Sequence, residues 1–257
     1  MFRSLSVLTL GALFLSCTPE TEYDLILRNA TLYDGSGSSG YRGDLALQGD
    51  RIAAVGDIGR ARAPEEIDVD GLAVSPGFIN MLSWSTESLI LDGRSQSEIR
   101  QGVTLEVMGE GWSMGPLNDE MKRLALQRQT HIKYDIQWTT LGEYLEYLVE
   151  RGVSPNVASF VGATTIRIHE IGEEDRPPTP EELERMKALV RQAMEEGAMG
   201  VASALVYAPA FYAETDELIA LAEVASEYDG MYISHMRSEG SRLLEAFDEL
   251  LSIAEAA

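Results

Sequence analysis

The sequence predicts an α/β protein in which a small all-β segment precedes a larger part built from alternating strands and helices. Two observations predict this class. Residues 22–74 contain short runs of alternating apolar and polar residues separated by Gly and Asp, which is typical of hairpins. From residue 75 to 257, strand-like runs are separated by amphipathic helices, which indicates βαβ units and a parallel sheet. This sheet is either a barrel or doubly wound.

Length and charge narrow the function classes. The chain has 257 residues, enough for one large domain or two modest ones, and a formal net charge of −22. Nucleic-acid binding is excluded as a function class, because phosphate neutralisation needs clustered Lys and Arg. A single cysteine excludes an internal disulfide framework. The composition leaves the oligomeric state open.

Residues 1–17 have the pattern of an export signal. Arg3 precedes an apolar run from Leu5 to Leu15 that is too short to span a bilayer. Cys17 follows directly, and the segment resembles a bacterial lipoprotein signal in which this cysteine is lipidated. We therefore expect an exported, periplasmic or cell-surface lipoprotein that meets the membrane through a lipid anchor only. The alternative is an ordinary signal peptide with an incidental cysteine.

The elements follow in order. In the β segment, the turn Gly49–Asp50 joins two short strands as a hairpin. A helix is predicted from Thr179 to Gly197, with Thr179 as N-cap and Pro180 at the first helical position, and another starts at Thr215. Strands are predicted at five places in the larger part: Gly77–Leu82, Thr104–Met108, Val157–Gly162, Gly200–Leu205 and Met231–His235. No GxGxxG motif follows any of them, which disfavours dinucleotide binding.

Motifs along the chain point to one family. Asp24–Ala30 with Asp34–Gly37, Gln101–Thr104, Glu196–Gly200, Tyr207–Pro209 and Tyr232–Gly240 occur in a characteristic order. From about residue 23 onward the chain resembles the amidohydrolase superfamily, in its D-aminoacylase (N-acyl-D-amino-acid deacylase) branch. The resemblance implies a metal-dependent (β/α) TIM-type barrel preceded by a small β-sandwich segment. It also implies hydrolysis of the amide bond of N-acyl D-amino acids or related small amides.

The metal motifs depart from this family. The superfamily carries His-x-His on the first barrel strand, where this chain has Leu82 and Trp84. The deacylases carry a metal-binding cysteine after the second strand, where this chain has Glu110. Carboxylate oxygen is an accepted zinc ligand, so the resemblance implies one divalent ion, zinc, on His235 and Glu110. A core histidine and a structural loop carboxylate are the alternatives.

Three residues are candidates for binding the substrate: Tyr207, Arg237 and Trp112. The resemblance places Tyr207 in a loop at the catalytic face, with simple packing as the alternative. Arg237 shares strand parity with His235, and a salt bridge at the barrel rim is its alternative role. Trp84 and Trp112 are expected to make the mouth more apolar. Glu106 shares strand parity with Met108 and Glu110, so it is expected to face inward and to form a buried ion pair.

The number of strands is too small for a closed barrel. Such a barrel needs eight strands and typically ~250 residues, whereas only five strands are predicted after Pro76. We therefore expect an amino-terminal fragment of a longer enzyme, inactive by itself, with the catalytic acid-base residue beyond Ala257. The alternative for the whole protein is a non-catalytic barrel, depleted of metal, that acts as a surface binding lipoprotein.

Overall fold

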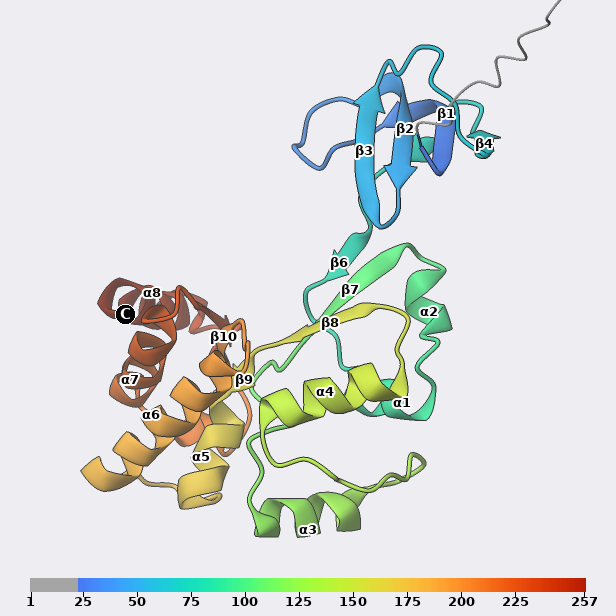
Figure 1. The fold of residues 1–257 in the computed structure, drawn as a ribbon. Coiled ribbons are helices and arrows are strands. Elements are labelled where there is room, and N and C mark those ends of the chain that lie inside the picture. The colour runs from blue at the N-terminus through green and yellow to red at the C-terminus, as the bar shows by residue number, and fades with distance from the viewer. Residues whose placement is uncertain (1–22) are drawn as a thin grey trace, which may run out of the picture. The chain divides into compact units, whose positions relative to one another are not determined.

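A computed structural model describes residues 23–257, which divide into two compact units at Pro76 and Gly77. The predicted signal with its lipidation site, Cys17, lies outside the described residues. Within residues 23–257, every helix is too short or too polar to cross a bilayer. The order of strands and helices confirms the predicted α/β class (Figure 1).

The smaller unit is a mixed five-stranded sheet. Strands β1 (Leu25–Leu32), β2 (Tyr41–Gln48) and β3 (Arg51–Gly56) form an antiparallel meander, and β4 (Glu65–Asp68) and β5 (Ala73–Val74) pair with β1 in parallel. The predicted hairpin is confirmed between β2 and β3. Its turn requires glycine, because Gly49 has a φ of +59°. The Gly49 N–H donates to the Asp24 carboxylate over 2.6 Å, which joins the turn to the start of β1.

The larger unit is an arc of parallel strands. Two three-stranded sheets, β6-β7-β8 and β9-β10-β11, join where β8 runs into β9 with only Phe160 between them. All five predicted strand regions contain strands, but the first ends at Asn80 and the predicted strand Val157–Gly162 is divided at Phe160 into β8 and β9. In residues 23–257, β6 and β11 pair on one side only, and Phe78 and Met231 on these edges are 60% and 46% exposed. The strands are β6 (Phe78–Asn80), β7 (Val103–Met108), β8 (Asn156–Ser159), β9 (Val161–Gly162), β10 (Gly200–Ala204) and β11 (Met231–His235).

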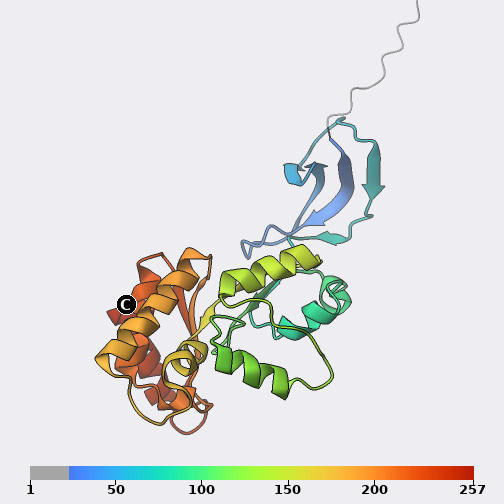
Figure 2. The same ribbon diagram turned by 60° about the horizontal axis from the view of Figure 1, so that its bottom comes forward.

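Helices cover this arc on its outer side (Figures 1 and 2). The two predicted helices are confirmed as α6 and α7. In α6 the capping box is complete, because the Thr179 hydroxyl accepts from the Glu182 N–H and the Glu182 carboxylate accepts from the Thr179 N–H. The helices are α1 (Thr86–Leu91), α2 (Gln96–Ile99), α3 (Asp119–Arg128), α4 (Leu141–Arg151), α5 (Ala163–Ile171), α6 (Pro180–Glu195), α7 (Thr215–Ser226) and α8 (Leu243–Ala256), with a 3-10 turn η1 at Ala210–Tyr212.

Alternate residues of the strands face opposite sides. Val107, Phe160 and Ala202 form one buried cluster, whereas Met108 and Val201 belong to the larger core packed against the helices. The predicted inward orientation of Glu106 is wrong, because Glu106 and Met108 point to the same side of the strand and that side faces the helices. Gly109 then breaks the alternation with a φ of +97°, so that Glu110 does not point to the same side as Glu106 and Met108.

Instead of forming an ion pair, the fully buried Glu106 accepts hydrogen bonds from two hydroxyls. The Ser83 hydroxyl donates over 2.6 Å and the Ser95 hydroxyl over 2.9 Å. These contacts join β7 to the segments that flank α1. Two donors satisfy part of the carboxylate's capacity to accept hydrogen bonds, as a buried charged group requires.

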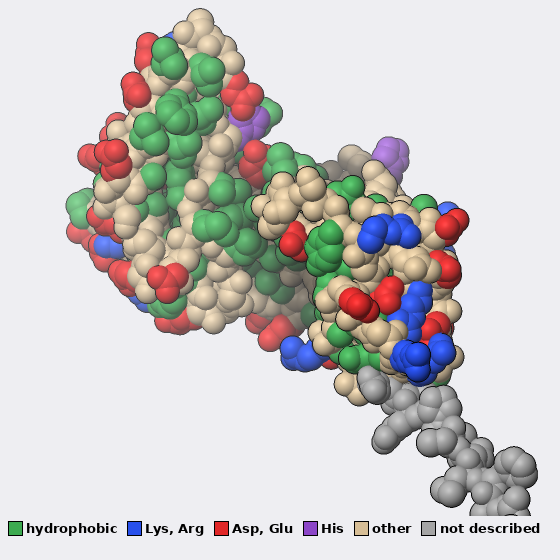
Figure 3. Space-filling view, turned by 90° about the horizontal axis from the view of Figure 1, so that it is seen from above, with side chains coloured by type: hydrophobic (Ala, Val, Ile, Leu, Met, Phe, Trp, Pro, Cys, Tyr) green, Lys and Arg blue, Asp and Glu red, His purple; other side chains and the backbone are tan. Residues whose placement is uncertain are grey.

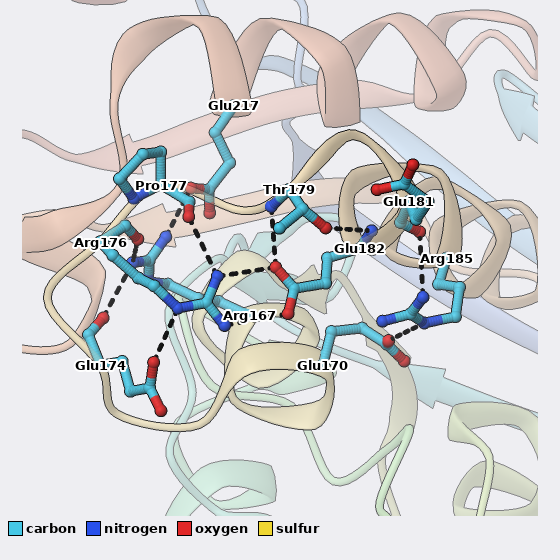
Figure 4. Close-up of polar contacts among 10 residues, drawn as sticks. All are labelled: Arg167, Glu170, Glu174, Arg176, Pro177, Thr179, Glu181, Glu182, Arg185 and Glu217. Carbon is cyan, nitrogen blue, oxygen red and sulfur yellow. Dashed lines mark hydrogen bonds and ion pairs between the residues drawn. The ribbon is translucent and has the colours of Figure 1, made fainter.

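A polar cluster holds the acidic loop between α5 and α6 (Figure 4). Arg167 of α5 is fully buried and forms an ion pair with Glu217 of α7. Its guanidinium also donates to the backbone carbonyls of Glu174 and Arg176 in the loop. Arg176 pairs in turn with Glu182 of α6, so one chain of ion pairs and hydrogen bonds joins three helices.

Hydrophobic side chains also reach the surface of the larger unit. Figure 3 shows them gathered on one face, with acidic side chains along the border. The exposed large apolar residues of this unit include members of β6, β11 and α8.

Candidate active site

His235 ends β11 at the carboxyl edge of the sheet. It lies two residues after Ile233, so both side chains point to the face of the arc opposite the helices. Its partner in the neighbouring strand is Ala204, the last residue of β10. The Leu205 N–H donates to the His235 carbonyl over 2.8 Å, which holds the two strand ends together. In parallel α/β sheets the functional groups gather at this edge.

Glu110 reaches His235 because the loop after β7 crosses the ends of β9 and β10. Gly111 presses on β10 so closely that a Cβ atom there would lie 2.6 Å from the Ala204 Cβ. The Gly111 carbonyl accepts from the Thr164 N–H at the start of α5. As a result, Glu110 Oε1 lies 3.5 Å from His235 Nδ1. The two predicted metal ligands are therefore side by side.

A second carboxylate lies on the other side of the imidazole. Glu239 Oε1 is 3.5 Å from His235 Nε2. The two carboxylates differ in their surroundings, because the side chain of Glu110 is 14% exposed and that of Glu239 is 64% exposed. Glu110 is the fixed neighbour of the histidine, and Glu239 is the solvated one.

Tyr207 lies beside the same imidazole, in the loop after β10. The two rings meet edge to face, with centroids 5.4 Å apart and planes at 84°. The Tyr207 N–H donates to the Ala204 carbonyl, which fixes the start of this loop. Tyr207 is largely exposed, so one edge of its side chain is free to meet a ligand. Its role in binding the substrate stays a prediction.

Arg237 forms the rim salt bridge that was its alternative role. Its guanidinium makes two hydrogen bonds of 2.9 Å to Glu249 of α8 and donates to the carbonyls of Phe211 and Ala213. Burial raises the pKa of a carboxyl group, but the hydrogen bonds from Arg237 and Thr215 outweigh it and leave the pKa of Glu249 below its usual value. Arg237 thus joins three loop and helix segments, and its role in binding the substrate stays a prediction.

Trp112 lines a cavity of about 260 Å³ instead of facing His235. Trp84 lines the same cavity. Leu82 is half exposed, and its N–H is held by the Asn80 side chain. The carboxyl end of β6 therefore supplies apolar surface and no metal ligand.

His235 and Glu110 do not complete a metal site by themselves. Catalytic zinc has three protein ligands and an open position. Among residues 23–257 no three His, Cys, Asp or Glu side chains gather in a way that would hold an ion. His131 lies in an exposed loop and His169 in α5, and neither is close to this pair. We therefore derive no chemical step through a metal from these residues.

The sequence did not reveal the cavity or the partners of Glu106. Helix α3 forms one wall of the cavity. Its N-cap, Asn118, is followed by two acidic residues, and this pattern in the sequence would have predicted the start of the helix. The serine partners of Glu106 carry no signal, because Ser83 and Ser95 come from separate segments.

A histidine and a carboxylate lie at the carboxyl edge of a parallel arc with helices outside, which is where (β/α) barrels carry their active sites. No protein-family model matches the sequence. The chain is 35% identical to a D-aminoacylase of Alcaligenes xylosoxydans xylosoxydans, over 90% of this chain and 48% of that protein.

Two solved structures agree with this similarity. A crystal structure of D-aminoacylase, described as defining a subset of amidohydrolases, is 33% identical with a TM-score of 0.81. An N-acyl-D-glutamate deacylase of Bordetella bronchiseptica, solved with zinc and a phosphonate inhibitor, is 29% identical with a TM-score of 0.80. Each covers 91% of this chain, which spans 49% of either structure. The chain belongs to the D-aminoacylase branch of the amidohydrolase superfamily.

Proposed function

We propose that the whole protein is a metal-dependent amidohydrolase that cleaves the amide bond of N-acyl D-amino acids. The observation that carries the proposal is the pair of His235 and Glu110 at the carboxyl edge, in a chain similar to D-aminoacylase. In this proposal the two side chains are ligands of one divalent ion, zinc, and further sequence completes the ligand set. When bound, zinc would lower the pKa of a bound water and polarise the substrate carbonyl.

The residues of this chain have defined parts in the proposal. The Glu110 carboxylate lies on one side of the His235 imidazole. The close contact of Gly111 with Ala204 fixes the distance between Glu110 and His235. Tyr207 limits the space beside the imidazole and presents its exposed edge to the substrate. Burial of Glu110 beside the ring excludes water from that side.

The test is hydrolysis of N-acetyl-D-amino acids by the full-length protein, with and without chelator. His235→Ala is expected to abolish turnover and to lower the bound zinc per chain. His131→Ala, which removes an exposed loop histidine, is the control and is expected to change neither. Turnover that survives both His235→Ala and chelation would contradict the metal-dependent mechanism, whereas a full-length protein without any turnover would leave the non-catalytic binding function.

We further propose that residues 1–257 alone do not turn over the substrate. Both β6 and β11 have one unpaired edge in the described part of the chain, and the ligand set is incomplete there. Purified 257-residue chain is expected to show no hydrolysis under conditions in which the longer protein is active. Equal specific activity of the two would contradict this expectation.

We also propose export as a lipoprotein anchored through Cys17, on the strength of the apolar run that ends two residues earlier. Cys17→Ser is expected to move the protein from the membrane fraction to the soluble fraction without a change in turnover. Equal membrane association of both forms would contradict it.

A further inference from the structure

The cavity beside Trp112 has the composition of a site for one apolar group. Its volume is about 260 Å³, smaller than the ~300–1,000 Å³ of pockets that take a whole drug-sized ligand. Helices α3 and α5 and the segments around Trp84 and Trp112 supply its walls. The apolar lining includes Trp84, Trp112, Leu117, Met121, Ile136 and Ile168.

The cavity is joined to the candidate active site through one short loop. Trp112 is two residues after Glu110, and its N–H donates to the Glu110 carbonyl over 2.7 Å. The Ser113 N–H donates to the Thr165 hydroxyl of α5, which fixes the next residue. The loop after β7 therefore presents a carboxylate to His235 and an indole to the cavity.

The charged side chains at the cavity indicate which half of an N-acyl amino acid it would bind. The charged side chains that line it are Glu87, Glu173 and Arg128, and Arg128 lies 3.7 Å from Glu173. Glu87 accepts a hydrogen bond from the Tyr134 hydroxyl. Burial and the contact with Glu87 raise the pKa of Tyr134, so its hydroxyl stays protonated and adds no charge.

Two carboxylates against one guanidinium leave an excess of negative charge among the side chains that line the cavity. The amino-acid half of the substrate carries its own carboxylate next to the side chain, and that charge would be repelled here. The acyl half carries no charge. An uncharged aliphatic chain therefore matches both the lining and the charge of the cavity.

We propose that this cavity binds the acyl chain of the substrate, and that the enzyme prefers N-acyl groups longer than acetyl. The inference rests on the proposed function for its substrate, and it adds a specificity site made by Trp84, Trp112 and α3. Each methylene buried there is expected to improve binding by up to about fourfold, equivalent to about 0.8 kcal/mol. The gain ends when the cavity is full.

The first experiment measures kcat/KM of the full-length protein for N-acyl-D-alanines with acyl chains of increasing length. The value is expected to rise with each methylene from acetyl to hexanoyl. Ala125→Phe, which fills the cavity from α3, is expected to remove this rise. Leu126→Phe is the matched control on the same helix, because Leu126 is exposed and does not line the cavity.

A second variant and a second measurement keep the test decisive. If Ala125→Phe lowers the unfolding temperature, Ala125→Leu is used in its place. The smaller side chain fills less of the cavity, so it is expected to reduce the rise of kcat/KM with acyl length instead of abolishing it. Binding of octanamide, measured by calorimetry and by the fluorescence of Trp84 and Trp112, needs no turnover. Octanamide is expected to bind the wild type and the Leu126→Phe variant, and acetamide is expected to bind neither.

The outcomes separate this inference from the proposed function. Octanamide binding that is lost in Ala125→Phe, in a protein without hydrolytic activity, would support the cavity and contradict the amidohydrolase. Turnover with no dependence on acyl length would support the amidohydrolase and overturn the cavity's role. A series of N-acetyl-D-amino acids in which Ala125→Phe removes the preference for large side chains would also overturn it, because the cavity would then hold the other half of the substrate.

Discussion

The two halves of the barrel arc each bury one carboxylate on the side of the helices, and they satisfy it in different ways. In the β6–β8 half, Glu106 accepts from the neutral hydroxyls of Ser83 and Ser95. In the β9–β11 half, Glu217 meets the guanidinium of Arg167, which is itself buried. Removal of the charge leaves neutral donors in the first case and an uncompensated cation in the second. The same chemical change is therefore expected to have unequal costs.

The largest expected effect is that of Glu217→Gln. Breaking a buried ion pair by removing one partner lowers the free energy of unfolding by about 3–5 kcal/mol, because the remaining charge stays buried. Denaturant unfolding of the variant would measure this loss. Glu227→Gln is the control, since its pair with Arg191 is exposed and is expected to contribute about 0–1 kcal/mol. Equal losses in the two variants would contradict the role given to burial.

Arg237→Ala tests whether the rim salt bridge is structural. Hydrogen bonds to a charged group are worth about 1.5–3 kcal/mol, so we expect a loss of stability in this range. Glu249→Ala removes the other partner and is expected to cost a similar amount. Loss of substrate affinity in Arg237→Ala without a loss in Glu249→Ala would instead support the substrate-binding role predicted from the sequence.

Glu110→Gln and Glu239→Gln compare the buried and the solvated neighbour of His235. Loss of a group that orients or joins a metal site lowers activity by about 10–100-fold, and we expect this for Glu110. Glu239 is mostly exposed, and its replacement is expected to leave kcat/KM nearly unchanged. Zinc content and turnover of the full-length variants measure both effects. A larger effect at Glu239 would assign the main carboxylate to the loop after β11.

Glu106→Gln tests the buried carboxylate that accepts from neutral hydroxyls. The amide is close in shape to the carboxylate and keeps one oxygen for a serine hydroxyl, which can rotate. The expected loss in free energy of unfolding is about 0.5–1.5 kcal/mol, the value of an ordinary hydrogen bond. A loss as large as that of Glu217→Gln would show that the two serines are not the groups that stabilise Glu106.

The smallest expected effect concerns an exposed pair and depends on pH. The hydrogen bonds from Arg176, and then from the Thr179 N–H, lower the pKa of Glu182 to about 2. A carboxyl whose folded pKa is depressed stabilises the fold above its unfolded pKa, and this contribution is lost as pH falls. The difference in unfolding temperature between wild type and Glu182→Gln should therefore shrink between pH 4.5 and about 2. Glu184→Gln, a neighbouring exposed carboxylate, is the control.

Much of the fold could be predicted from local patterns. The capping box at Thr179 and the apolar spacing behind it act within one helix, so the sequence shows them directly. The five strands are short apolar runs between turns and were found in the right order. The parity argument failed at Gly109, because a positive φ interrupts the alternation and turns Glu110 toward the opposite face from Glu106.

The sequence by itself determined the α/β class, the family and the candidate histidine, because these depend on residue types at fixed spacings along the chain. The tertiary structure decided which groups meet. Glu110 lies beside His235 only because a glycine lets its loop press on β10. Arg237 pairs with Glu249, and Trp112 turns from the histidine to a cavity walled by α3. Such contacts join segments far apart in the chain, and no local pattern encodes the packing that selects one partner over another.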